Sequence, residues 1–143
     1  MYQRILVPLD GSELAETVLT HVVPLAQRFA ASVTLLQVIA EAEPGTIEDY
    51  LRGAALGLHG QGISVAIEYP EGRPSSVIIN RASQLGTDLI AMTSHGRGGL
   101  GRAVFGSVAD EVLRQAPCPV LLVRVVDVPS EPDDPLRPAF AYA

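Results

Sequence analysis

The chain has 143 residues, of which 48% are hydrophobic and 18% are charged. This balance fits one globular domain and excludes a disordered chain. The net charge is −6 and all ten basic residues are arginine, so we expect no attraction to nucleic acid and no phosphate-binding lysine. The single cysteine, Cys118, excludes an internal disulfide and any multi-cysteine metal site. With no apolar run of ~18 residues and no signal peptide, we expect a cytoplasmic protein that does not bind membranes.

Five short apolar segments predict five β-strands, in the chain order 5–9, 33–39, 63–69, 88–92 and 120–126. The third segment alternates between apolar and polar residues, which indicates a half-exposed strand near a sheet edge. The fifth segment, Val120–Val126, is apolar on both faces. If it lies at an edge, it needs a cover.

Between these strands, apolar residues recur at helical spacing and predict helices. The first helix begins at Ser12, where Ser12 or Asp10 can cap it, and Pro24 is expected to kink it or end its regular part. Residues 46–59 and the stretch from Pro74 to about residue 86 predict two more helices. A capping-box pattern predicts that Ser107 caps the last helix.

Alternating strands and helices with short links predict a parallel α/β fold. We expect a five-stranded, Rossmann-like open sheet with helices on both faces. Residues 1–126 form the predicted nucleotide-binding domain, and residues 127–143 form an acidic, proline-rich tail that we expect to be extended. Ligands of such sheets bind beyond the carboxyl ends of the strands, where the strand order reverses.

A glycine-rich loop follows the fourth predicted strand and ends where the last helix begins. Its glycines free backbone amides for an anion, and the helix start, the Ser107 hydroxyl and Arg97 add donors, which together suit a polyphosphate. The Walker pattern fails because it needs a lysine. The dinucleotide fingerprint matches at Gly96, Gly98 and Gly101, but a helix should open inside that pattern, and no acid follows at the required distance.

Three motifs resemble the universal stress protein family. Gly96, nine residues, then Gly106 and Ser107 match the nucleotide loop of its ATP-binding members, although Thr93 replaces the first glycine. Residues 4–12 are similar to the family's opening strand and acid, and residues 116–123 are similar to its closing strand. The likeness spans residues 3–125.

The resemblance implies a set of site residues for ATP, with AMP or ADP as possible ligands, and Mg²⁺ or Mn²⁺. Asp10 would meet the ribose and the metal, unless it only caps the first helix. Thr93 would lie at the ribose, where it could crowd the sugar or hydrogen-bond to it. Backbone contacts to adenine are implied for Val38, Ile39 and Met92, and phosphate contacts for Gly96, Arg97, Gly106, Ser107 and Val108.

The sequence therefore predicts a regulatory protein that acts through nucleotide-linked changes at its surface, rather than through rapid ATP hydrolysis. Pairing of Val120–Val126 with the same strand of a second copy would cover that strand, and the resemblance implies the same homodimer. The tail folding over the strand is the alternative. Two other functions stay open: a structural interaction module that binds no nucleotide, which Thr93 favours, and an NAD-dependent enzyme. Protein partners are not predicted.

Overall fold

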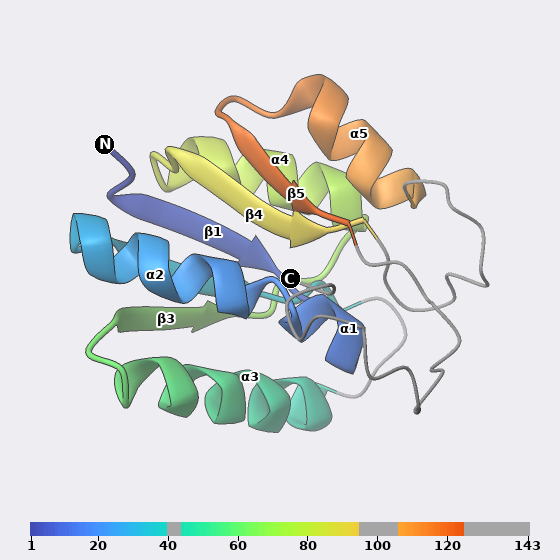
Figure 1. The fold of residues 1–143 in the computed structure, drawn as a ribbon. Coiled ribbons are helices and arrows are strands. Elements are labelled where there is room, and N and C mark those ends of the chain that lie inside the picture. The colour runs from blue at the N-terminus through green and yellow to red at the C-terminus, as the bar shows by residue number, and fades with distance from the viewer. Residues whose placement is uncertain (40–43, 95–105, 125–143) are drawn as a thin grey trace, which may run out of the picture.

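Five parallel strands form one sheet in the computed structural model, which describes residues 1–39, 44–94 and 106–124 (Figure 1). The strand order is β3-β2-β1-β4-β5. The strands are β1 (Arg4–Pro8), β2 (Ser32–Leu36), β3 (Ser64–Glu68), β4 (Leu89–Thr93) and β5 (Val120–Val123). The predicted five-stranded parallel sheet is confirmed, and β3 is an edge strand as its alternation indicated.

The described helices lie on both faces of this sheet. They are α1 (Glu13–Glu16), α2 (Leu19–Phe29), α3 (Pro44–His59), α4 (Pro74–Gln84) and α5 (Ser107–Gln115). Side chains alternate between the two faces along each strand, and β1 illustrates this, because it has buried residues on both faces of the sheet. Ile5 and Val7 belong to one cluster of buried residues, and Leu6 belongs to the other.

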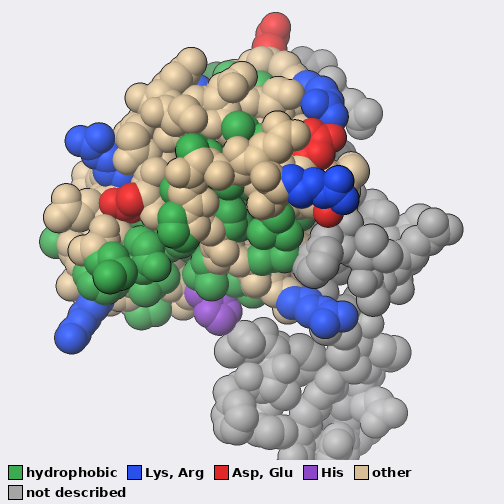
Figure 2. All heavy atoms as spheres, turned by 90° about the horizontal axis from the view of Figure 1, so that it is seen from above, with side chains coloured by type: hydrophobic (Ala, Val, Ile, Leu, Met, Phe, Trp, Pro, Cys, Tyr) green, Lys and Arg blue, Asp and Glu red, His purple; other side chains and the backbone are tan. Residues whose placement is uncertain are grey.

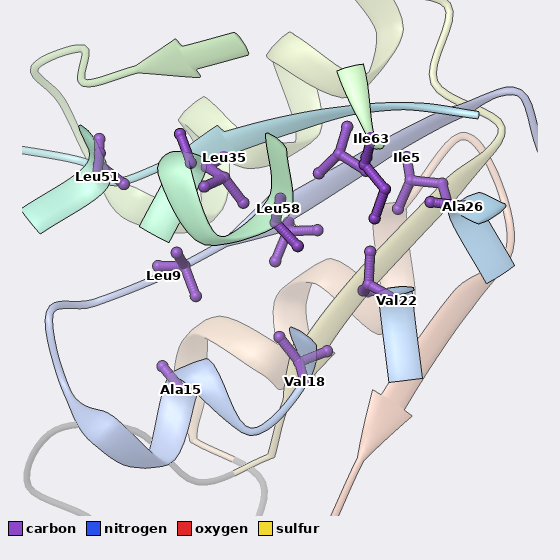
Figure 3. Close-up of a cluster of buried hydrophobic side chains, with 14 of the residues drawn as sticks. Ile5, Leu9, Ala15, Val18, Val22, Ala26, Leu35, Leu51, Leu58 and Ile63 are labelled. Atoms are coloured by element: carbon purple, nitrogen blue, oxygen red, sulfur yellow. The ribbon is translucent and has the colours of Figure 1, made fainter. Parts of the chain in front are cut away.

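The larger core cluster lies between the sheet and helices α1, α2 and α3 (Figure 3). Figure 3 shows the side chains of α2 and α3 converging on those of the strands, with Val22 near Ile5, and Leu58 between Leu35 and Ile63. Val18, Val22 and Leu35 are completely buried. Burial of apolar area on this scale is the main source of the fold's stability.

The second cluster lies under α4 and α5. Ile78 and Ala82 of α4 and Ala109 and Val112 of α5 pack on the face that carries Leu6, Leu36, Ile90 and Met92. Cys118 lies at the margin of this cluster, half-buried. Burial raises the pKa of its thiol, as for a cysteine that packs in the core and stays protonated.

The register and order of the central strands locate the switch point of the sheet. β1 pairs with β2 along its whole length, from Arg4–Ser32 to Pro8–Leu36. Its pairing with β4 comprises Ile5–Leu89 and Leu6–Ile90, although both strands continue beyond these pairs. The chain also reverses its direction of travel across the sheet here, since β2 and β3 lie on one side of β1 and β4 and β5 on the other. This is the switch point at which open α/β sheets bind ligands.

One local prediction is wrong: the first predicted helix is two helices, because residues 17 and 18 form a turn between α1 and α2. Pro24 was expected to kink this helix or to end its regular part. The second alternative is excluded, because α2 continues to Phe29 and closes at Ala30 in the left-handed conformation (φ 52°). The predicted tail, residues 127–143, lies outside the described residues, as do Val125 and Val126.

Candidate functional site

The predicted site residues that the structure describes lie at the carboxyl edge of the sheet or at the start of α5. Asp10 follows β1, Val38 and Ile39 follow β2, and Met92 and Thr93 end β4. The N–H of Ile39 donates to the carbonyl of Pro70 at 2.8 Å, which continues the pairing of β2 and β3 beyond their ends. Ser107 and Val108 start α5, and Gly106 precedes them. Gly96 and Arg97 lie outside the described residues.

Asp10 organises the turn between β1 and α1. Its Oδ1 accepts hydrogen bonds from the backbone N–H of Ser12 at 2.9 Å and from the Ser12 hydroxyl at 2.6 Å. The Ser12 Oγ in turn accepts from the N–H of Ala15 at 3.1 Å. Ser12 is therefore the cap of α1, and Asp10 holds that cap. Of the two caps that the sequence left open, the structure assigns the role to Ser12.

Tyr50 of α3 supports the same turn, and no pattern in the sequence predicted this role. Its hydroxyl donates to the carbonyl of Ser12 at 3.4 Å. Burial is the main cause that raises the pKa of Tyr50, and the nearby carboxylates of Glu16 and Asp10 raise it further. The hydroxyl therefore stays protonated and remains a donor at physiological pH.

Gln37 is a second site residue that the sequence prediction missed. Its side chain is buried beside the turn, and a Cβ placed on Gly11 would lie 3.4 Å from Nε2 of Gln37. Gly11 has a φ of +86°, so glycine suits this position both for its conformation and for its closeness to the amide. A signal was present in the sequence, because Gln37 is the one polar residue in the apolar run from Leu35 to Ile39.

Thr93 stands where the ATP-binding pattern has glycine, and its place in β4 shows how the residue is accommodated. Thr93 pairs with Val123 of β5 and is 9% exposed. By alternation it shares a face with Leu89 and Ala91, which belong to the cluster under α1, α2 and α3. A β-branched side chain suits such a strand position.

The start of α5 lies next to the end of β4. The N–H of Gly106 donates to the carbonyl of Ser94 at 3.4 Å, and the carbonyl of Gly106 accepts from the N–H of Asp110 at 3.0 Å. Gly106 is thus the N-cap residue, and Ser107 is the first helical residue. The prediction that Ser107 caps this helix is wrong, because Gly106 takes the cap position. No side chain in the described part of the chain caps the helix. Amides at an uncapped helix start can donate hydrogen bonds to an anion.

A polar contact between α4 and α5 holds that helix in place. The buried hydroxyl of Ser75 donates to Oε2 of Glu111 at 2.6 Å, and the guanidinium of Arg73 pairs with Oε1 of the same carboxylate. The Ser75 hydrogen bond, together with the charge of Arg73, lowers the pKa of Glu111. The orientation of the α5 start is therefore fixed by groups outside the site.

The edge of the sheet thus has two chemically different ends. Acceptor groups gather at the β1 turn, and donor amides gather at the start of α5. Within residues 1–39, 44–94 and 106–124 there is no group of three or more His, Cys, Asp or Glu side chains that could hold a metal ion. No helix among the described residues is long and apolar enough to span a membrane.

The comparisons with known proteins agree with this architecture. A model of the universal stress protein family matches residues 1–124. The universal stress protein MJ0531 of Methanocaldococcus jannaschii is 30% identical over 141 residues, which cover 87% of this chain and 83% of that protein.

Solved structures give the same result. The universal stress protein UspA of Lactobacillus plantarum is 28% identical, with a TM-score of 0.75 and coverage of 85% of this chain and 97% of that one. A universal stress protein in complex with cAMP, at 22% identity, shares the fold, with a TM-score of 0.72 and coverage of 86% and 97%. The chain belongs to the universal stress protein family.

Proposed function

We propose that this protein binds ATP, or AMP or ADP, together with Mg²⁺ or Mn²⁺, and that the bound nucleotide alters the surface it presents to partner proteins. The start of α5 is the observation that carries the proposal. Its N-cap is glycine, no described side chain caps it, and a hydrogen bond ties it to the end of β4 at the switch point. Free amides at a helix start bind phosphate well.

The acceptors at the β1 turn and the amides at the start of α5 suggest how the nucleotide is oriented along the carboxyl edge of the sheet. We place the phosphates at Gly106, Ser107 and Val108, with Gly96 and Arg97 as further predicted contacts. The sugar lies toward Asp10 and Thr93. The base meets the backbone of Val38, Ile39 and Met92.

A metal ion would bind mainly through the phosphates. Mg²⁺ commonly keeps several waters and takes one or two carboxylates together with substrate phosphates. Asp10 is the carboxylate that we assign to it. Its Oδ1 already accepts two hydrogen bonds from Ser12, which fixes the carboxylate in place for this role.

Likeness to a cAMP-bound protein of the same fold supports a nucleotide as the class of ligand. The test is isothermal titration of the protein with ATP and with AMP, each with and without Mg²⁺. We expect saturable binding of one nucleotide per chain. Absence of heat at millimolar nucleotide would favour the structural interaction module instead.

The NAD-dependent enzyme finds less support. The dinucleotide fingerprint needs an acidic residue about 20 positions beyond its last glycine, and in this chain that position falls within the apolar run from Val120 to Val123. A parallel titration with NADH decides this point. Binding of NADH in preference to ATP would reverse the assignment.

A further inference from the structure

The amide of Gln37 is a buried group whose acceptor has no partner. Gln37 is 6% exposed, and within the described part of the chain no donor reaches its Oε1. Buried polar atoms in native proteins are almost always hydrogen-bonded, so an exception calls for an explanation. A ligand that supplies the missing donor is one such explanation.

The position of this amide connects it to the candidate site. The backbone N–H of Gln37 donates to the carbonyl of Glu68 at 3.0 Å, which fixes the residue just beyond the end of β2. Its side chain reaches toward the neighbouring β1 turn, where a Cβ on Gly11 would lie 3.4 Å from Nε2 and 3.9 Å from Oε1. Gly11 adjoins Asp10, so the amide and the carboxylate lie at the same turn.

The side-chain donors of this turn are already engaged elsewhere. The Ser12 hydroxyl donates to Asp10, and the Tyr50 hydroxyl donates to the carbonyl of Ser12. The turn is rich in acceptors: the carboxylate of Asp10, whose Oδ1 accepts two hydrogen bonds from Ser12, and the amide oxygen of Gln37. Such a site repels a phosphate and suits a neutral group that carries two donors.

We propose that Gln37 is a specificity-determining residue that accepts a hydrogen bond from a ribose hydroxyl of the bound nucleotide. This inference rests on the proposed function. The vicinal diol of ribose has two O–H donors, one for Asp10 and one for Gln37. The terminal torsion of glutamine is broad, so the amide can turn its oxygen toward the sugar. The protein then prefers ribonucleotides to analogues that lack one of the two hydroxyls.

The experiment titrates ATP, 2′-deoxy-ATP and 3′-deoxy-ATP into the wild-type protein and into Gln37→Met, which keeps the length of the side chain and removes the acceptor. Wild type is expected to bind ATP about three- to tenfold more tightly than one of the deoxy analogues. Gln37→Met is expected to bind ATP more weakly than wild type by this same factor. It should bind that deoxy analogue with the same affinity as wild type.

Two controls separate this role from a structural one. Gln61→Met makes the same change in an exposed residue before β3, at the opposite end of the sheet, and should keep the wild-type preference. The melting temperature of ligand-free Gln37→Met should equal or exceed that of wild type, because the variant removes a buried acceptor without a partner.

Other outcomes overturn the inference. An equal loss of affinity for all three nucleotides would assign Gln37 to packing of the turn. A loss that appears only with Mg²⁺ would assign its oxygen to the metal. If wild type binds ATP and both deoxy analogues equally, Gln37 does not read the sugar although the proposed function stands. If wild type binds no nucleotide at all, the proposed function fails first.

Discussion

Gly106 is the residue at which the proposed phosphate contact can be tested by a single substitution. Its φ of −54° and ψ of 156° are accessible to any residue, and no described atom lies within 4 Å of a Cβ placed there. Nothing in residues 1–39, 44–94 and 106–124 therefore requires a glycine here. We expect Gly106→Val to weaken ATP binding at least about tenfold, because a branched side chain keeps the phosphate from the helix amides.

The same variant should leave the fold intact. The free energy of unfolding of Gly106→Val, measured by thermal melts, should stay within about 1 kcal/mol of the wild-type value, as for a substitution without steric conflict. Gly53→Val is the matched control, since Gly53 is exposed on α3 and also has no atom near its Cβ position; it should keep the wild-type affinity. Unchanged ATP binding by Gly106→Val would place the phosphates elsewhere.

Individual residues also show what the sequence could and could not predict about the site. Asp10 and Ser12 were recognisable because an acid and a hydroxyl follow a strand and precede a helix. Ser107 was misjudged because the capping-box pattern also fits when the preceding glycine takes the cap. Tyr50 and Gln37 were missed because they reach the β1 turn from other elements, and only the packing of α3 and β2 against β1 brings them there.

At the scale of elements, the contact between α4 and α5 makes the stability of the protein depend on pH. The pKa of Glu111 is lowered in the folded protein, chiefly by the Ser75 hydrogen bond. Its contribution to stability is therefore complete above its ordinary pKa of 4.5 and is lost as the pH falls through the lowered value. Glu111→Gln should melt below wild type at pH 7, and the two melting temperatures should converge toward pH 3.

The measurement is a series of thermal melts of both proteins between pH 7 and pH 3. In an Arg73→Ala background the difference at pH 7 should be smaller, because Arg73 is the other partner of this carboxylate. A difference in melting temperature that does not change with pH would show that Glu111 acts through packing and not through its charge.

Elements were predicted well where apolar patterns are strong and poorly where the chain turns locally. All five strands and the order of the helices follow from the sequence, since alternating periods leave few topologies. The break between α1 and α2 was not visible, because the helical spacing of Leu14, Val18 and Val22 continues through it. The tolerance of α2 for Pro24 was not visible either, because tertiary packing of Val22 and Ala26 holds that helix.

At the scale of the whole molecule, β5 is the strand whose edge needs a partner. It is the last strand of the sheet on its side, and Val120, Leu121 and Leu122 are only half-buried. Figure 2, which views the molecule from the side of α5 and β5, shows hydrophobic side chains gathered at this surface. An apolar edge strand of this kind favours pairing with another chain, and a two-fold symmetric pair is the simplest arrangement.

We therefore expect a homodimer that forms through β5, and the hydrogen-bond pattern identifies the residue to change. The carbonyls of Pro119 and Val123 accept from Ile90 and Ser94 at 3.0 and 2.9 Å, so by alternation the N–H of Leu122 points away from β4. Leu122→Pro removes a donor toward a partner and none toward β4. Light scattering should give the mass of two 15.1 kDa chains for wild type and for Leu122→Ala, and of one chain for Leu122→Pro. A wild-type monomer, or a Leu122→Pro dimer, would show that β5 is covered in another way.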